Sequence, residues 1–204
     1  MGFYAAHVLP HVINLSMRNG LLLPYRQRAI SKAKGRVLEI GIGSALNLPY
    51  YGAGVEEVLG LEPDRRLMRM AERSSSRSQR RVVLMEGSAE SIPLDDASVD
   101  TVVTTWTLCS IPDASGALRE MRRVLKPEGQ LLFVEHGRAP EDRVVKWQDR
   151  LTPLWKVIGG GCHLNRPITT LIESAGFRIA ELNKGYMRGP KPMTFMYEGR
   201  ATRA

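Results

Sequence analysis

The stretch Glu39-Ile40-Gly41-Ile42-Gly43-Ser44-Ala45 decides the fold of this chain of 204 residues. It contains the end of residues 36–40, a short and largely apolar run with the length and composition of a buried strand. Glycines directly after such a strand allow a tight turn and a close approach of the backbone to a ligand. Ligands of open α/β sheets bind at this end of the strands, so the stretch predicts both a sheet and a site at its edge.

The rest of the chain continues the alternation of strands and helices. Further strands are predicted at residues 55–61, 82–86, 99–105, 130–135, 177–182 and 193–199. Helices are predicted from Asp64 to about 78, from Asp113 to about 125, at 141–150 and at 167–175, the first two capped by their aspartates. This alternation is typical of a parallel sheet covered on both faces. The predicted fold class is α/β, a Rossmann-like doubly wound sheet of seven mostly parallel strands, with one strand antiparallel.

The N-terminal residues follow a different pattern. Residues 3–18 carry apolar side chains at roughly helical spacing, interrupted by Pro10, and Pro24 is suited to the first turn of a second helix that stops by Gly35. We therefore expect an N-terminal helical cap over residues 1–34 and an α/β domain over residues 35–204.

The chain is basic, with a net charge of +8, and its apolar content of 43% allows an ordinary core. Five arginines recur at helical spacing and predict one basic stripe: Arg66, Arg69, Arg73, Arg77 and Arg80. Such a stripe is typical of a solvated helix face, and the alternative is contact with an anionic lipid surface. It lies away from the strand ends, so we expect no nucleic-acid partner.

Cysteine usage and hydropathy indicate the compartment. Cys109 and Cys162 are far apart and form no disulfide framework, which fits a reducing environment. No apolar run approaches the roughly 18 residues of a membrane span, and no secretory signal is recognised. The expectation is a cytoplasmic protein, with peripheral contact at the inner membrane face as the alternative.

The residues after each strand indicate the kind of ligand. Leu46 stands where a nicotinamide-dinucleotide fingerprint requires glycine, whereas Glu39 is placed to anchor an amino group that a dinucleotide lacks. Glu62 ends the second strand about twenty residues after the glycines, where a carboxylate accepts hydrogen bonds from ribose hydroxyls. The turns Ser88-Ala89-Glu90 and Thr105-Trp106 follow the third and fourth strands.

These features in this order resemble the class I S-adenosylmethionine-dependent methyltransferases, in the group that contains the quinone C-methyltransferases. The stretches at 93–100 and 118–129 strengthen the resemblance. It implies S-adenosylmethionine as the cofactor. The donor-binding residues that it implies are Glu39, Gly41, Gly43, Ala45, Asn47, Glu62, Pro63, Ser88, Ala89, Glu90, Thr105 and Trp106. Ala45 and Ser88 depart from the family pattern, which often has glycine and an acidic residue there.

The segments 47–51, 107–110, 134–136, 147–148 and 161–166 resemble the membrane-associated thiol S-methyltransferases. That resemblance implies a small thiol as acceptor. A thiol must ionise, so a base would help, and the candidate catalytic residues are His136 first, at the end of the fifth predicted strand, and His163 second, with a structural role in a hydrogen-bond network as the alternative for each. Phospholipid amines and quinone rings remain alternatives, as do a non-catalytic adenosylmethionine-binding protein and a nucleic-acid-binding protein. The Cys162-His163 pair has no partner cluster in the sequence, so no metal is expected.

Overall fold

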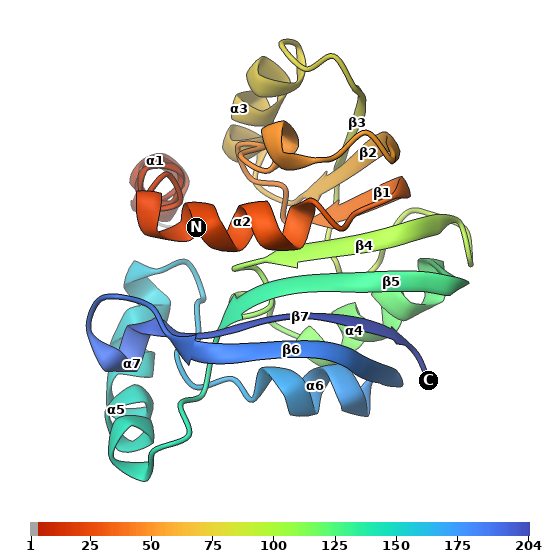
Figure 1. The fold of residues 1–204 in the computed structure, drawn as a ribbon. Coiled ribbons are helices and arrows are strands. Elements are labelled where there is room, and N and C mark those ends of the chain that lie inside the picture. The colour runs from red at the N-terminus through yellow and green to blue at the C-terminus, as the bar shows by residue number, and fades with distance from the viewer. Residues whose placement is uncertain (1–3) are drawn as a thin grey trace.

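The computed structural model describes residues 4–204, except for the side chains of residues 5 and 6, and holds one seven-stranded sheet (Figure 1). The strands are β1 (Gly35–Ile40), β2 (Val55–Glu62), β3 (Arg81–Glu86), β4 (Val99–Thr105), β5 (Leu125–His136), β6 (Phe177–Tyr186) and β7 (Phe195–Arg203). Their order is β3-β2-β1-β4-β5-β7-β6, and β7 is antiparallel to both of its neighbours. The predicted fold class is confirmed, including the single antiparallel strand.

Helices accompany the strands in the expected places. They are α1 (Leu9–Ser16), α2 (Leu23–Ile30), α3 (Arg65–Ser75), α4 (Ala114–Val124), α5 (Asp142–Ile158), α6 (Ile168–Ser174) and α7 (Lys191–Thr194). Shorter helical segments span Tyr4–Val8, Gly20–Leu22 and Leu48–Tyr50. Asp64 and Asp113 cap α3 and α4 as predicted, each accepting hydrogen bonds from backbone amides of the first turn. No helix of residues 4–204 is long and apolar enough to cross a membrane.

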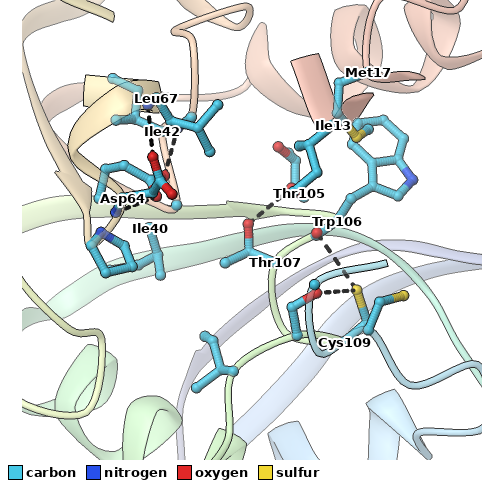
Figure 2. Close-up of a pocket in the computed structure, with 18 of the residues that line it drawn as sticks. Ile13, Met17, Ile40, Ile42, Asp64, Leu67, Thr105, Trp106, Thr107 and Cys109 are labelled. Atoms are coloured by element: carbon cyan, nitrogen blue, oxygen red, sulfur yellow. Dashed lines mark hydrogen bonds between the residues drawn. The ribbon is translucent and has the colours of Figure 1, made fainter. Parts of the chain in front are cut away.

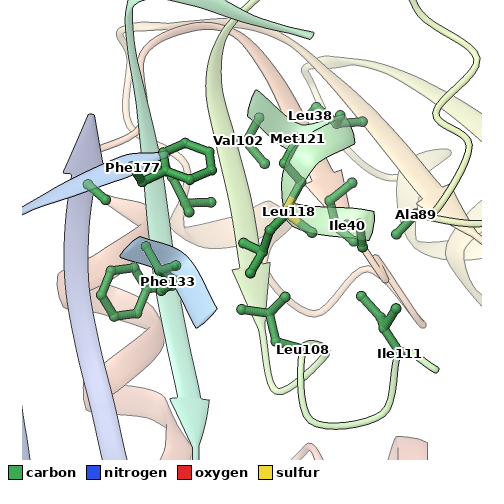
Figure 3. Packing of buried hydrophobic residues seen from close by; sticks show 14 of the residues in the cluster. Leu38, Ile40, Ala89, Val102, Leu108, Ile111, Leu118, Met121, Phe133 and Phe177 are labelled. Atoms are coloured by element: carbon green, nitrogen blue, oxygen red, sulfur yellow. The ribbon is translucent and has the colours of Figure 1, made fainter. Parts of the chain in front are cut away.

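The core lies on both faces of the sheet because successive strand residues point to opposite sides. On β1, Leu38 and Ile40 pack with α4 and α6, whereas Val37 packs with Ile30 and Ala71 from the side of α2 and α3. Figure 3 shows the first of these clusters around the α4 residues. Burial on both faces explains why the strands read as nearly continuous apolar runs.

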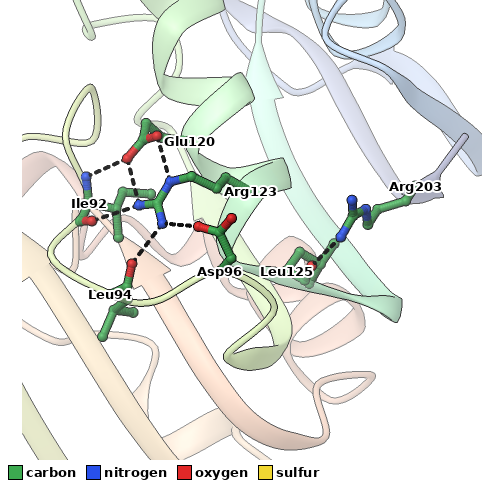
Figure 4. Close-up of polar contacts among 7 residues, drawn as sticks. All are labelled: Ile92, Leu94, Asp96, Glu120, Arg123, Leu125 and Arg203. Carbon is green, nitrogen blue, oxygen red and sulfur yellow. Dashed lines mark hydrogen bonds and ion pairs between the residues drawn. The ribbon is translucent and has the colours of Figure 1, made fainter.

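Arg123 of α4 fixes the loop between β3 and β4. Its guanidinium donates to the carboxylates of Glu120 and Asp96 and to the carbonyl oxygens of Ile92 and Leu94 (Figure 4). Glu120 also accepts from the Ile92 amide at 3.0 Å. This polar cluster closes the end of the sheet opposite the predicted site, where it holds the amino-terminal end of β4.

Several predicted boundaries were wrong. Helix α3 ends at Ser75, since the hydroxyls of Ser75 and Ser76 bond back to helix carbonyls and favour termination. Arg77 and Arg80 therefore lie beyond the helix, and Arg80 donates to two backbone carbonyls, so the predicted stripe of five arginines on one helix does not form.

One helix and three strands of the second half are longer than predicted: α5, β5, β6 and β7. Helix α5 continues through Pro153 to Ile158 because its buried residues Val145, Gln148 and Thr152 keep one face packed. Strand β5 begins at Leu125, and residues 126–129 interrupt its pairing with β4 as an irregularity rather than a break. Strands β6 and β7 extend to Tyr186 and Arg203 because they pair with each other along their whole length.

Candidate functional site

A cavity of about 520 Å³ opens at the carboxyl ends of β1, β2, β4 and β5. Figure 2 shows Ile42, Asp64 and Leu67 at one end, Trp106 and Cys109 at the other, and Thr105 and Thr107 between them. Helix α1 and the residue that follows it form one wall through apolar side chains that include Leu9, Ile13 and Met17. A cavity of this size with few polar groups is typical of a small-molecule site.

The glycine turn after β1 forms the backbone wall of the cavity. Gly41 and Gly43 both adopt positive φ, at 65° and 58°. A Cβ atom on Gly41 would lie 2.5 Å from the Thr107 side chain, so this position excludes larger residues. Ala45 also has a positive φ of 61°, which explains why the family pattern often places glycine there.

Glu39 is the most enclosed carboxylate of the cavity wall. Its Oε1 accepts a hydrogen bond from Asn47 Nδ2 at 2.7 Å, and its Oε2 accepts one from the Tyr51 hydroxyl at 2.7 Å. Burial outweighs these hydrogen bonds and raises the pKa of Glu39 to about 7. The nearby Arg26 guanidinium already favours the ionised carboxylate without offsetting the effect of burial, and a cationic amino group in the cavity would favour it further.

Glu62 ends β2 and joins the glycine turn to α3. Its carboxylate accepts hydrogen bonds from the Gly43 amide at 2.9 Å and the Asp64 amide at 3.0 Å. Burial raises the pKa of Glu62, while the two amide hydrogen bonds favour its charged form. Each carboxylate oxygen retains acceptor capacity, so Glu62 is able to accept hydroxyl donors from a ligand in the cavity.

Arg26 of α2 reaches the same network from the N-terminal segment. Its guanidinium donates to Asn47 Oδ1, donates to the Met17 carbonyl at 3.1 Å, and lies 4.8 Å from the ring centroid of Trp106. Trp106 itself has a φ of 52°, an uncommon conformation that is typical of functional sites. Sequence analysis missed Arg26, which lies in a segment without a ligand motif, and it gave Tyr51 no role of its own although the segment 47–51 was singled out.

The far end of the cavity contains sulfur and imidazole. Cys109 follows β4, His136 ends β5 and Cys162 lies in the glycine-rich loop after α5, and all three side chains line the cavity. Their ligand atoms lie within 4.8 Å of one another, and His136 Nε2 is 3.0 Å from Cys162 Sγ. The sequence drew attention to Cys162-His163, but the structure instead brings Cys162 to Cys109 and His136.

Electrostatics divide the protons unequally within this cluster. Interaction with the Cys162 thiol and with His136 outweighs burial and lowers the pKa of Cys109. Interaction with Cys109, together with burial, raises the pKa of Cys162. Burial disfavours the imidazolium, yet the charge of Cys109 raises the pKa of His136. His136 Nδ1 is buried without a hydrogen-bond partner among the described residues.

Glu135 supports the loop that carries Cys109. Its Oε1 accepts hydrogen bonds from the Thr104 hydroxyl at 2.9 Å and from the amides of Thr107 and Leu108 at 3.0 and 3.1 Å. Burial raises the pKa of Glu135 to about 8. This carboxylate therefore sets the direction of the chain after β4, and with it the positions of Trp106 and Cys109.

The predicted donor-binding residues do not all line the cavity. Those that do are Glu39, Gly41, Gly43, Asn47, Glu62, Pro63, Ser88, Ala89, Thr105 and Trp106. Ala45 is buried beneath the turn, and Glu90 points to α4, where it accepts the Asp113 amide at 2.7 Å. His136 lines the cavity, but His163 does not, because its Nδ1 lies 3.1 Å from the carbonyl oxygen of Cys109.

Comparisons with known proteins agree with this geometry. A family model described as a methyltransferase domain matches residues 38–133. Thiol S-methyltransferase TMT1B of Rattus norvegicus is 36% identical over 152 residues, which are 72% of this chain and 61% of that protein. The human TMT1B is 32% identical over 179 residues, which are 84% of this chain and 71% of that protein. The chain thus spans about three fifths of the rat relative.

Solved structures extend the comparison to the fold. A SAM-dependent methyltransferase of Thermotoga maritima, described as a possible histamine N-methyltransferase, matches with a TM-score of 0.68 at 22% identity. The match covers 97% of this chain and 99% of that chain, and at this identity it shows the fold alone. The chain belongs to the S-adenosylmethionine-dependent methyltransferase family, whose fold and sequence imply S-adenosylmethionine as its cofactor.

Proposed function

We propose that this protein transfers the methyl group of S-adenosylmethionine to a small thiol. The observation that carries the proposal is the far end of the cavity, where Cys109, His136 and Cys162 meet apolar side chains of α1 and α5. Small thiols are soft and weakly polar. An apolar wall that carries sulfur atoms therefore suits a thiol better than it suits a strongly hydrated amine. The thiol S-methyltransferases to which the chain is similar support the same acceptor class.

The cavity residues fit the donor at its other end. Glu39 is a buried carboxylate that lacks a cationic partner in direct hydrogen-bond contact, and it suits the amino group of a methionine moiety. Glu62 suits the ribose hydroxyls, and Ser88 and Ala89 border the space next to it. When bound, S-adenosylmethionine supplies an activated methyl group on a sulfonium. The chain then has mainly to orient the two reactants and exclude water.

Ionisation of the acceptor is the remaining chemical requirement. A thiol with its ordinary pKa of about 8.5 is only a few per cent thiolate at neutral pH. His136 is the histidine of the cavity wall, and its buried Nδ1 has no partner among the described residues, so it is placed to accept a proton or to hold a thiolate. The sulfur of the thiolate attacks the methyl carbon, and the bond between that carbon and the sulfonium sulfur breaks.

A methylation panel tests the acceptor. Purified protein is incubated with radiolabelled donor and, in separate arms, with ethanethiol, phosphatidylethanolamine vesicles or a demethylated quinone. Methylation of the thiol arm above the other two is expected. Transfer to lipid or quinone alone would replace the thiol proposal, and S-adenosylhomocysteine binding without turnover in any arm would favour a non-catalytic role.

A pair of variants tests the role of His136. His136→Gln is expected to lower kcat for the thiol by about 10²-fold, the lower end of what proton transfer contributes. His11→Gln is the matched control, because His11 is an exposed histidine of α1 that does not line the cavity. Equal rates for both variants would remove His136 from the reaction.

We further propose peripheral contact with an anionic membrane. Exposed apolar side chains lie on α1 and near the end of α5, among them Val12, Leu15, Leu154 and Val157. The helical segment Tyr4–Val8, which precedes α1, meets the end of α5 where the Tyr4 hydroxyl donates to the Ile158 carbonyl at 3.0 Å. Residues 1–38 contain no acidic residue, which suits a negatively charged surface.

Vesicle sedimentation tests this contact. The unmodified protein is expected to sediment with vesicles that contain phosphatidylglycerol more than with phosphatidylcholine alone, and Leu15→Glu is expected to reduce that binding. Equal recovery with both lipids, unchanged by the substitution, would contradict the proposal.

A further inference from the structure

Two thiols and one imidazole converge at the acceptor end of the cavity from three separate segments of the chain. Cys109 and Cys162 are 2% and 8% exposed, and with His136 they place two sulfur atoms and one nitrogen within 4.8 Å of one another. Among residues 4–204, outside the side chains of residues 5 and 6, no other such group of potential metal ligands is found. Nothing in methyl transfer from a sulfonium requires this combination.

The loops around the cluster are built to hold it in place. The His163 amide donates to the Cys109 carbonyl at 2.8 Å, so the chain on either side of the two cysteines is cross-linked by backbone. Glu135 Oε1 holds the amides of Thr107 and Leu108, just before Cys109. Rigid placement from the surrounding backbone is what a metal centre needs to fix its geometry.

We propose that Cys109, His136 and Cys162 bind one divalent ion of the zinc type and leave its fourth position open to the cavity. Two thiolates and one imidazole form a ligand set that catalytic zinc sites use, with water or substrate as the fourth ligand. Tetrahedral ligands at about 2.0–2.3 Å from zinc lie roughly 3.3–3.8 Å apart. The observed ligand atoms lie within 4.8 Å of one another, which is near that spacing, and His136 Nε2 is 3.0 Å from Cys162 Sγ.

Charge around the cluster is compatible with a cation. Two thiolates neutralise a divalent ion, and the carboxylate of Glu135 lies close enough to interact with Cys109. Arg166 carries a positive charge, which opposes the binding of a cation. Its half-buried guanidinium donates to the Leu108 carbonyl rather than to either thiol. A fourth, anionic ligand would therefore be stabilised by Arg166 as well as by the ion.

The open position gives the ion a role that rests on the proposed thiol acceptor. An acceptor thiol would displace the bound water, release its proton to the solvent and remain on the ion as thiolate. Its sulfur would then form a bond to the methyl carbon while the carbon–sulfonium bond breaks, leaving the electron pair on the donor sulfur. Thiolate and sulfonium charges cancel, giving a neutral thioether. With the ion bound, the ion would promote the ionisation that the proposed function assigns to His136, and His136 would act by holding the ion, so its loss would lower the rate in either case.

Metal content is the first measurement, because it does not depend on activity. The reduced full chain is loaded with zinc, desalted and assayed for metal per chain, and a second sample is loaded with cobalt for absorption spectroscopy. We expect about one ion per chain, with the visible bands of tetrahedral cobalt and the ultraviolet bands of thiolate-to-cobalt charge transfer. Failure of the folded, unmodified protein to retain either ion would overturn the proposal.

Variants locate the site. Cys109→Ser and Cys162→Ser should each lose the charge-transfer intensity of one thiolate, and the double variant should lose the ion, with S-adenosylhomocysteine binding as the measure of folding. His11→Gln should retain one ion per chain. Full metal content in a folded double variant would place the ion elsewhere and refute the site. If the double variant does not fold, the cobalt spectrum of the unmodified protein decides, since a spectrum without thiolate bands refutes the same ligands.

Addition of ethanethiol separates this proposal from the proposed function. A change in the cobalt spectrum on addition is expected, and an unchanged spectrum would contradict an open position. Thiol methylation by a protein that holds no metal would sustain the proposed function and refute the metal site. Metal binding at the cluster without thiol methylation would sustain the site and refute the acceptor.

Discussion

Replacing Glu39 by glutamine should stabilise the ligand-free protein and weaken donor binding at the same time. Burial raises the pKa of Glu39 from its ordinary 4.5 to about 7. At about 1.36 kcal/mol for each pKa unit, ionising this carboxylate above pH 7 costs about 3 kcal/mol of folding free energy. Glutamine resembles the protonated acid, so it keeps two hydrogen-bonding atoms near Asn47 and Tyr51 without the buried charge.

The sign of the effect follows from proton binding. Between pH 4.5 and about 7 the folded protein binds more protons at Glu39 than the unfolded chain does. Its contribution to stability is therefore complete below pH 4.5 and is lost as the pH rises through about 7. Glu39→Gln should match the unmodified protein near pH 5 and exceed it by about 1–3 kcal/mol at pH 8.5, the lower limit allowing for relaxation of the buried site.

Urea unfolding at pH 5 and pH 8.5 measures the first effect, and calorimetric titration with S-adenosylhomocysteine at pH 8.5 measures the second. Loss of a hydrogen bond to a charged group should cost about 1.5–3 kcal/mol of binding, or roughly 10- to 100-fold in Kd. A variant that is no more stable at pH 8.5 would refute the buried ionisation. A more stable variant that binds with unchanged affinity would refute Glu39 as the anchor of the amino group.

Three further substitutions test other parts of the site. Glu62→Ala should weaken S-adenosylhomocysteine binding by about 1–3 kcal/mol in the same titration, and unchanged affinity would remove Glu62 from the donor site. Ala45→Gly should raise the free energy of unfolding in urea by up to about 1 kcal/mol, because glycine relieves the positive φ of 61°; a decrease would mean that this backbone is not strained. Arg26→Met should lower that free energy by about 1–3 kcal/mol by leaving the Asn47 amide oxygen without its donor, and an unaltered midpoint would show that Arg26 adds no stability.

Local sequence patterns predicted the elements that depend on local physics. Buried strands are recognised in the sequence as short apolar runs. Asp64 and Asp113 indicate helix starts because their carboxylates accept hydrogen bonds from backbone amides within a few residues. The predicted helix end at residue 150 was wrong, since the packing of the buried face of α5 carries the helix through Pro153 and outweighs the loss of one backbone hydrogen bond. Tertiary packing, which a short stretch of sequence does not reveal, determines where α5 ends.

That Glu39 and Glu62 lie at one edge of the sheet was predictable for the same reason, because they stand at or next to the carboxyl ends of adjacent parallel strands; their roles toward the donor stay a proposal. The acceptor end was not. Cys109, His136 and Cys162 come from three segments, and the conformation of two loops determines whether their side chains meet. In the sequence, Arg26 has the character of a solvated helix residue. In the fold it is buried, and its guanidinium lies over the ring of Trp106.

Polar contacts join the N-terminal segment to the end of the cavity that we propose for the donor. Asn14 of α1 accepts a hydrogen bond from Ser44 of the glycine turn at 2.6 Å, and Arg26 contacts both the Met17 carbonyl and Asn47. Asn47 in turn donates to Glu39. If an amino group binds at Glu39 as proposed, its charge would act on the same chain of hydrogen bonds that reaches α1. A membrane surface that engages the exposed face of α1 would therefore act on the same network that holds the donor.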